Sequence, residues 1–212
     1  MTRLFARLAV AVAVALALFA APVFAQDGSA PAPLPLPRVA LETSAGPIVI
    51  EVEARRAPIT AANFLKYVDE GRLDGTTFYR AMNTGPGRGI VQGGVNYDPG
   101  RVLPPIAHEP TTQTGLSHID GAVSMARHAP GTATGDFFIA VGAQQSYDAG
   151  RASSVDADGF AVFGKVVEGM ETVRAILGSP TSPTEGEGFM RGQMLDPRIT
   201  IVSARRLESV QP

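Results

Sequence analysis

Cysteine is absent from this chain of 212 residues. Its absence excludes disulfides, thiolate metal sites, a lipid-modified cysteine and a catalytic thiol, so we expect no redox chemistry. Positive charge is also scarce. Without the first 25 residues the chain carries 16 basic and 20 acidic side chains, a formal charge of −4. Nucleic-acid binding domains are strongly basic, so we expect no nucleic-acid partner.

Long apolar runs are scarce as well, and the uncharged run from Leu8 to Ala21 lies close to the N-terminus. Arg3 and Arg7 precede this run and Val23-Phe24-Ala25 follows it, which is the layout of a secretory signal peptide. Fourteen residues are few for a membrane span, which needs roughly 20. We therefore expect residues 1–25 to be a cleaved signal peptide that meets the membrane only transiently; a retained membrane anchor is the alternative.

Proline dominates the next segment, residues 26–37, whose sequence QDGSAPAPLPLP favours extended conformers and predicts a linker. From residue 38 onward, short β-branched and aromatic runs alternate with glycine and proline, which is typical of an all-β sandwich or barrel with helices attached. Eight strands are predicted: Val39–Thr43, Ile48–Val52, Thr76–Met82, Ile90–Gln92, Ala122–Met125, Phe137–Val141, Ala161–Val166 and Ile199–Arg205.

Two helices are predicted between these strands, Pro58–Glu70 and Gly169–Leu177, each followed by glycine. On the first helix we expect a buried face made of Ile59, Ala62, Leu65 and Val68. Three stretches have no apolar period and are predicted to be loops that form functional surfaces: Asn83–Gly89, Gly94–Ser117 and Gln144–Gly159.

Familiar catalytic and metal-binding sets are missing. The three histidines, at positions 108, 118 and 128, lie in separate segments without a histidine or carboxylate at metal-ligand spacing, which disfavours a zinc site or a catalytic triad. Gly85–Gly89 imitates a phosphate loop but has no Lys-Ser/Thr. Asp156–Gly159 resembles part of a calcium loop, yet Val167 stands where the glutamate is needed. We expect neither a metal nor a cofactor.

Arg80 stands out because strand alternation places it on the same side as Phe78 and Met82. From the residues alone, an arginine that extends from a strand edge into solvent is the more ordinary interpretation. An arginine held among apolar groups at a binding site is the alternative.

An ordered series of motifs supports the second interpretation. It consists of Thr76–Arg80, Gln92–Gly94, Gly121–Ala126, Gly135–Ile139 and Ala161–Met170. With these motifs, residues 38–207 resemble the cyclophilins, the peptidyl-prolyl cis-trans isomerases, and residues 208–212 form a short tail. The resemblance implies a mainly β fold, a closed eight-stranded antiparallel barrel capped by two α-helices.

The resemblance also implies a chemistry. Rotation about a peptide C–N bond faces a barrier of about 18–20 kcal/mol, and its catalysis requires neither a nucleophile nor a metal. Carried over from the family, Arg80 is the catalytic residue, Gln92 binds substrate backbone, and Phe138 is the floor of the proline pocket. Further substrate contacts are implied for Ile90, Ala126, Arg127, His128, Asp136, Tyr147 and Phe160. The expected partners are proline-containing segments of unfolded or exported proteins, and we expect a periplasmic monomer in a Gram-negative bacterium.

Several positions depart from the family pattern. Gly89, in a longer loop, stands where a pocket phenylalanine is expected, and Ser146-Tyr147 replace a bulky pair. Asp136 stands where a glutamine is usual, so it either pairs with Arg80 and holds it or competes with the prolyl nitrogen for it. These departures leave two functions open: an isomerase, or a proline-peptide binding module with little turnover. A barrel that carries a small apolar ligand is a weaker alternative, because large aromatic residues predict a filled interior.

Overall fold

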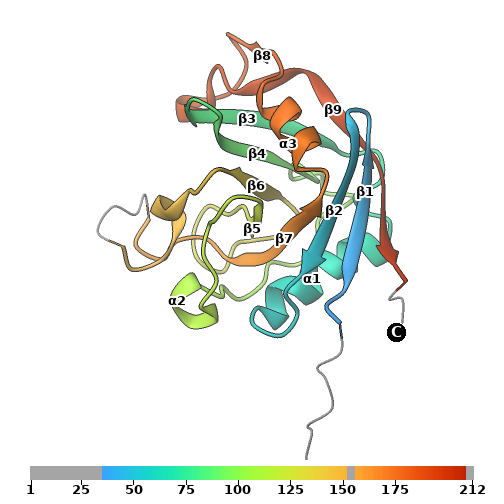
Figure 1. Cartoon of the computed structure of the whole chain (residues 1–212), viewed down its shortest axis with the longest axis vertical. Coiled ribbons are helices and arrows are strands. Elements are labelled where there is room, and N and C mark those ends of the chain that lie inside the picture. The colour runs from blue at the N-terminus through green and yellow to red at the C-terminus, as the bar shows by residue number, and fades with distance from the viewer. Residues whose placement is uncertain (1–34, 152–155, 209–212) are drawn as a thin grey trace, which may run out of the picture. The chain divides into compact units, whose positions relative to one another are not determined.

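The computed structural model describes residues 35–151 and 156–208 (Figure 1). The predicted signal peptide, residues 26–34 of the predicted linker and the last four residues lie outside the described parts. In those parts, no helix has the length and apolar character needed to cross a membrane.

One antiparallel sheet closes on itself to form a barrel (Figure 1). Its strands run in the order β1-β2-β7-β5-β6-β4-β3-β9, and β9 pairs again with β1, so these eight strands have no free edge. This confirms the predicted eight-stranded barrel. A ninth strand of two residues, β8, pairs with β9 outside the closed ring. The strands are β1 Arg38–Thr43, β2 Gly46–Val52, β3 Thr77–Gly85, β4 Arg88–Gly94, β5 Ala122–Met125, β6 Phe137–Val141, β7 Val162–Glu168, β8 Thr181–Ser182 and β9 Met194–Leu207.

Both predicted helices are present, α1 at Pro58–Asp69 and α3 at Met170–Leu177, and they cover different parts of the barrel (Figure 1). The predicted buried face of α1 is wrong at Ile59 and Ala62, which are exposed. Leu65 and Val68 are buried as predicted, and the helix also buries Ala61, Phe64 and Tyr67. A spacing of three residues drifts off the face of a helix that turns every 3.6 residues, whereas the spacings of three and four between Ala61, Phe64 and Val68 follow it.

The three predicted loops are more ordered than the sequence indicates. Asn83–Gly89 is not a loop, because β3 and β4 continue as a paired hairpin as far as Gly85 and Arg88, with the turn at Pro86-Gly87. The stretch Gly94–Ser117 contains a third helix, α2 at Thr111–Thr114, and Gln144–Gly159 contains a 3₁₀ turn at Gln145–Tyr147. Glycine and polar residues have low strand propensity, so the sequence does not predict a strand here. The strand forms because it pairs with its partner in the hairpin.

Aromatic rings fill the centre of the barrel. The ring centroids of Phe64 and Phe163 are 4.9 Å apart, those of Phe64 and Phe137 are 5.6 Å apart, and those of Phe78 and Phe137 are 5.8 Å apart. All four side chains are buried. These buried rings occupy the interior, as the sequence predicts, and they disfavour a barrel that carries a ligand.

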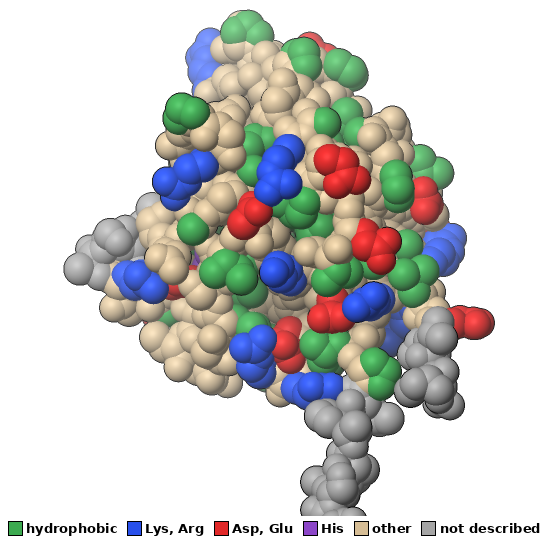
Figure 2. Space-filling view, in the orientation of Figure 1, with side chains coloured by type: hydrophobic (Ala, Val, Ile, Leu, Met, Phe, Trp, Pro, Cys, Tyr) green, Lys and Arg blue, Asp and Glu red, His purple; other side chains and the backbone are tan. Residues whose placement is uncertain are grey.

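Outside the barrel, basic and acidic side chains are interspersed across the face that Figure 2 shows. Several of them form exposed ion pairs, including Arg38 with Glu51 at 3.0 Å and Arg206 with Asp69 at 2.6 Å.

Candidate active site

A row of register partners crosses four strands on the outside of the barrel. Arg80 on β3 pairs with Gln92 on β4, Gln92 pairs with Phe138 on β6, and Phe138 pairs with Ser124 on β5. Residues that are opposite one another in a sheet point to the same face, so this register gathers four side chains that are far apart in the sequence.

A bulge in β3 decides which side Arg80 takes. The register shifts between Phe78 and Arg80, and Phe78 packs in the main core while Arg80 contacts Gln92 and Met82. The prediction that Arg80 lies on the same side of the strand as Phe78 is therefore wrong. The prediction that it lies on the same side as Met82 is confirmed. An extra residue in one strand interrupts the two-residue alternation from which that side was predicted.

Arg80 is a buried cation held by neutral groups. Its Nη1 donates to Gln92 Oε1 at 2.8 Å, its Nε donates to Gln193 Oε1 at 2.9 Å, and its Nη2 lies 3.4 Å from Met82 Sδ. The residue is 7% exposed, so it does not extend into solvent. Burial lowers the pKa of its guanidinium, an effect that the nearby Tyr147 and Tyr79 oppose. A guanidinium has five N–H groups, so three partners leave two N–H groups for a ligand.

Gln92 orients Arg80 from the next strand. Its Oε1 accepts from Arg80, and its Nε2 donates to the Tyr79 hydroxyl at 2.7 Å. Both ends of the amide are therefore fixed, which holds the acceptor in place beneath the guanidinium. The second N–H of Nε2 is the group that could meet substrate backbone, as predicted for Gln92.

Three predicted site residues form an aromatic floor beside Arg80. Phe138 lies 5.6 Å from Tyr147 and 5.5 Å from Phe160, and Tyr147 lies 5.5 Å from Phe160, all with the rings edge to face. Edge-to-face contacts of this kind are favourable and rigid. Phe138 is 3% exposed and belongs to a strand, whereas Tyr147 and Phe160 come from the segment between β6 and β7.

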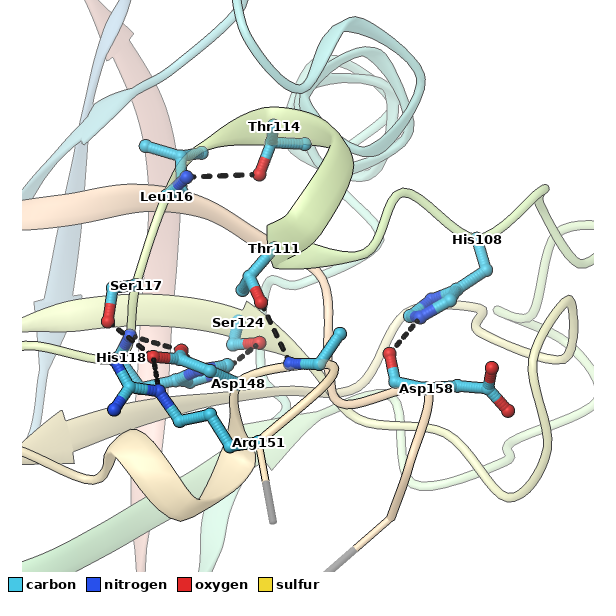
Figure 3. Close-up of polar contacts among 11 residues, drawn as sticks. His108, Thr111, Thr114, Leu116, Ser117, His118, Ser124, Asp148, Arg151 and Asp158 are labelled. Atoms are coloured by element: carbon cyan, nitrogen blue, oxygen red, sulfur yellow. Dashed lines mark hydrogen bonds and ion pairs between the residues drawn. The ribbon is translucent and has the colours of Figure 1, made fainter. Parts of the chain in front are cut away.

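His118, whose hydrogen bonds Figure 3 shows, packs against the Phe138 ring of this floor. The ring of His118 stacks on Phe138 with centroids 5.7 Å apart and planes 8° apart. His118 Nδ1 lies 2.7 Å from Asp148 Oδ1, and His118 Nε2 lies 3.0 Å from Ser124 Oγ. A carboxylate only accepts, so Nδ1 carries the proton and Nε2 accepts from the serine. Burial lowers the pKa of His118 and favours this neutral form, although Asp148 opposes the shift.

The order Ser124, His118, Asp148 is that of a nucleophilic triad, and sequence reasoning missed it because no spacing signals it. Ser124 and His118 are both 0% exposed, so no substrate can reach the hydroxyl. The set is therefore a support and not a nucleophile. Burial raises the pKa of Asp148, but hydrogen bonds from Ser117 and His118 together bring it below its ordinary value.

The loop that carries Asp148 is anchored on both sides of this support (Figure 3). Thr111 Oγ1, on α2, accepts from the backbone N–H of Ala149 at 2.8 Å. Arg151 Nε lies 3.4 Å from Asp148 Oδ2. His108 Nε2 lies 2.9 Å from the carbonyl oxygen of Asp158. Short α2 thus holds the segment that presents Tyr147 to the floor.

Asp136 is a buried anion on the other side of the site. Its Oδ1 accepts from the backbone N–H of Asn96 at 2.7 Å, and the N–H of Tyr97 also faces the carboxylate. Asn96 and Tyr97 both have left-handed backbone, with φ of 49° and 57°. Non-glycine residues seldom adopt this conformation, and the carboxylate stabilises it by accepting from the turn.

Burial raises the pKa of Asp136 to about 6, against the effect of these backbone N–H groups. The Tyr79 hydroxyl also opposes the rise, but its geometry falls short of a hydrogen bond, and Oδ2 is buried without a partner. In the part of the chain that the structure describes, no ion pair joins Asp136 to Arg80. The prediction that Asp136 pairs with Arg80 or competes for it is therefore wrong, whereas its predicted contact with substrate stays a prediction.

Residues 38–205 match the family model of the cyclophilin type peptidyl-prolyl cis-trans isomerases. The chain belongs to the cyclophilin family. It is 38% identical over 153 residues to the peptidyl-prolyl cis-trans isomerase cyp18 of Streptomyces antibioticus, covering 70% of this chain and 87% of the relative. It is 36% identical over 148 residues to peptidyl-prolyl cis-trans isomerase B of Escherichia coli, covering 68% and 85%.

Solved structures agree with the fold. A crystal structure of a cyclophilin type isomerase from Cryptosporidium parvum, determined in the presence of the dipeptide Ala-Pro, aligns with a TM-score of 0.65 at 20% identity, covering 81% of this chain and 99% of the other. This likeness supports the fold, and the family match with the named relatives supports peptidyl-prolyl cis-trans isomerase activity.

The side chains of Arg127 and His128, on the segment predicted to pair with substrate backbone, contact other residues of the protein. The side chain of Arg127 is 1% exposed, forms an ion pair with Asp156 at 3.0 Å, and lies 5.0 Å from the ring of Phe160. It also donates to the carbonyl oxygen of Gly159. Arg127 thus supports Phe160 from behind. His128 is exposed and stacks on Tyr97 at 5.4 Å.

The remaining predicted contacts are backbone or apolar. The backbone N–H of Ala126 donates to the carbonyl oxygen of Asp136 at 2.9 Å, just beyond the end of β5. Ile90 is 4% exposed and pairs with Met82 and Ala140 in the register. It therefore lies next to Met82, a contact of Arg80, and its predicted contact with substrate stays a prediction.

Gly89, which stands where a pocket phenylalanine is expected, lies against the backbone of β3 and against Leu177 of α3. A Cβ at this position would lie 2.1 Å from the carbonyl oxygen of Met82 and 2.9 Å from Leu177 Cδ1. The continued pairing of β3 with β4 brings that backbone into contact, so position 89 cannot carry a wall residue.

Proposed function

We propose that this cyclophilin isomerises X-Pro bonds in exported proteins and that Arg80 stabilises the twisted amide. The observation that carries the proposal is the state of Arg80. It is a buried guanidinium oriented by Gln92 and Gln193, with no carboxylate partner among the described residues, beside the aromatic floor of Phe138, Tyr147 and Phe160.

The chemistry follows from the loss of resonance. The twisted amide loses its partial double bond, so the prolyl nitrogen becomes pyramidal and basic. A charged N–H donor aimed at that nitrogen stabilises the twisted state more than the planar one, and each 1.36 kcal/mol of that difference is about tenfold in rate. Arginine stays protonated even when burial lowers its pKa, and its planar fork is rigid. Gln92 and Gln193 fix the fork before the substrate arrives, which is what electrostatic catalysis requires.

The other groups would bind the peptide. The rings of Phe138, Tyr147 and Phe160 offer an apolar surface to the prolyl ring, and the segment Ala126–His128 lies at the end of β5, where an extended peptide could pair with it. Without a catalyst, cis-trans isomerisation of an X-Pro bond takes tens of seconds, which is long for a protein that folds after export.

Exchange spectroscopy on an Ala-Pro peptide tests the isomerase role. With wild-type protein we expect the cis-trans exchange rate to rise well above its uncatalysed value. An Ala-Ala peptide serves as the binding control and should bind more weakly. If the Ala-Pro peptide binds but its exchange rate stays at the uncatalysed value, the isomerase role is lost and a proline-peptide binding module remains.

The exported location rests on the sequence of residues 1–25 alone. Expression of the full chain in a Gram-negative host should yield a periplasmic protein whose mass corresponds to a chain that begins at Gln26. A full-length mass in the membrane fraction would instead favour a retained anchor.

A further inference from the structure

A closed loop of nine residues, Glu185–Gln193, lies next to Arg80, and we call it the 185–193 loop. Its base is the pairing of β8 with β9, in which Ser182 faces Met194. Inside the loop, the N–H of Gly192 donates to the carbonyl oxygen of Glu185 at 3.0 Å, and the N–H of Gln193 donates to that of Met190 at 3.0 Å. These bonds and the 3₁₀ turn Gly188–Met190 give the loop a defined shape.

The loop joins the site at two points. The N–H of Ala81 donates to the carbonyl oxygen of Gln193 at 2.9 Å, which fixes the loop to β3 next to Arg80. Gln193 Oε1 accepts from Arg80 Nε at 2.9 Å although the two residues are 113 positions apart. Gln193 Nε2 then donates to the carbonyl oxygen of Phe189 at 2.8 Å. A single amide thus holds both the guanidinium and the tip of the loop.

Phe189 is the tip of this loop. Its ring centroid lies 5.4 Å from Arg80 Cζ, a cation–π contact, and the residue is 78% exposed. Single exposed apolar side chains are common on protein surfaces. Phe189 differs because its ring contacts the guanidinium of Arg80, the proposed catalytic group, while most of the Phe189 surface stays exposed to solvent.

We propose that Phe189 is the outer wall of the peptide site and that Gln193 is a positioning residue for Arg80. The open surface of Phe189 contacts an apolar side chain next to the proline, so peptides with an apolar residue before proline are preferred. Gln193 fixes the direction of the guanidinium fork, so it acts on the twisted state through Arg80. This inference rests on the proposed function of Arg80.

Steady-state exchange measurements on a Leu-Pro and an Ala-Pro peptide test both residues. For Phe189→Ala we expect KM for the Leu-Pro peptide to rise about tenfold, the size of a lost aromatic contact in a binding site, and to rise less for Ala-Pro. Phe189→Tyr should restore KM to within about twofold. The control is Val202→Ala, which truncates another exposed apolar side chain, on β9, with 58% exposure. If Phe189→Ala behaves like this control, or if it raises kcat/KM because the ring merely covers Arg80, the wall is overturned.

For Gln193→Leu we expect kcat to fall about tenfold while KM stays within about twofold, the pattern of a lost transition-state interaction. Gln113→Leu, at an exposed glutamine of α2, is the control. Gln193→Met replaces the leucine variant if thermal melting shows that the latter does not fold. An unchanged kcat, or a change in KM alone, overturns the positioning role.

The peptide dissociation constant separates this inference from the proposed function. If wild type does not accelerate exchange, the isomerase mechanism is wrong, and so is the positioning role of Gln193. The proposed role of Phe189 as the outer wall is then tested by peptide binding alone. A tenfold weaker complex of Phe189→Ala with the Leu-Pro peptide supports the wall, and an unchanged one overturns it.

Discussion

Arg80 and Asp136 carry opposite charges, both are buried near Tyr79, and they do not pair. Arg80 is held by neutral side-chain acceptors and an aromatic ring, whereas Asp136 is held by backbone N–H groups of a left-handed turn. Pairing would have satisfied both charges, and it would also have occupied the N–H groups that a substrate needs. The comparison shows that the Arg80 guanidinium keeps N–H groups for a ligand, whereas the Asp136 carboxylate stabilises the backbone turn at Asn96 and Tyr97.

The consequence for protonation also differs between the two residues. Burial lowers the pKa of Arg80, yet arginine remains charged at any ordinary pH. Burial raises the pKa of Asp136 to about 6, so this carboxyl titrates just below neutral pH. The four predictions below test this comparison, from the largest expected effect to the smallest.

The largest effect concerns the pH dependence that Asp136 contributes. Its folded pKa of about 6 lies above its unfolded value of 3.8, so its contribution to stability is fully present below pH 4 and is lost as pH rises through 6. A difference of roughly 2 pKa units corresponds to about 3 kcal/mol. We expect the free energy of unfolding of wild type to fall by about that amount relative to Asp136→Asn between pH 4 and pH 7. Denaturant titrations of the two proteins measure it, and parallel pH curves would contradict the prediction.

The second prediction gives Arg80 the carboxylate that it lacks. Gln193→Glu places an anion where Arg80 Nε now donates to a neutral oxygen at 2.9 Å. We expect kcat to fall about thirtyfold, or about 2 kcal/mol, because the paired guanidinium acts less on the prolyl nitrogen. Gln113→Glu makes the same charge change on α2 and should leave kcat unchanged. A Gln193→Glu protein with wild-type kcat would show that pairing does not matter.

The third prediction concerns the support behind the aromatic floor. His118→Phe keeps a ring against Phe138 but removes the hydrogen bonds to Asp148 and Ser124. We expect the free energy of unfolding to fall by about 1–3 kcal/mol because a buried carboxylate loses a donor. His128→Phe, at the exposed histidine stacked on Tyr97, is the matched control and should change it much less. Equal losses for the two variants, measured by urea denaturation, would refute the supporting role.

The smallest effect on stability is expected for an exposed ion pair, Arg206 with Asp69. Arg206 and Asp69 are 2.6 Å apart at the surface, with side chains 44% and 48% exposed. Exposed ion pairs contribute about 0–1 kcal/mol, so Arg206→Gln should lower the free energy of unfolding by less than about 1 kcal/mol. A larger loss would mean that paired surface charges matter as much as the unpaired buried ones.

Much of the barrel could be predicted from the sequence because its strands carry β-branched and aromatic runs between glycines and prolines. All eight predicted strands are present, as are both larger helices. The hairpin through Pro86-Gly87, the short β8 and the early part of β9 were missed. Most of their residues are polar, glycine or proline, and they are ordered by pairing with partner strands, which local composition does not record.

The site divides in a similar way. Motif resemblance indicated Arg80, Gln92 and Phe138, and the register brings them into one row. Gln193, Phe189 and the His118 support were missed because each reaches the site across a long sequence separation. Asp136 was predicted to act on Arg80, but its partners are two backbone N–H groups, and no side-chain pattern signals a backbone partner.

The central claim is that the unpaired guanidinium of Arg80 acts on the twisted amide, and Arg80→Lys tests it most directly. The variant keeps the positive charge but loses the planar fork. Exchange spectroscopy at saturating Ala-Pro peptide gives kcat, and a titration of the same sample gives the dissociation constant. We expect kcat to fall about a hundredfold, as for removal of one aimed donor, with the dissociation constant within about twofold of wild type. A wild-type kcat with weakened peptide binding would contradict the claim, because Arg80 would then only bind the substrate.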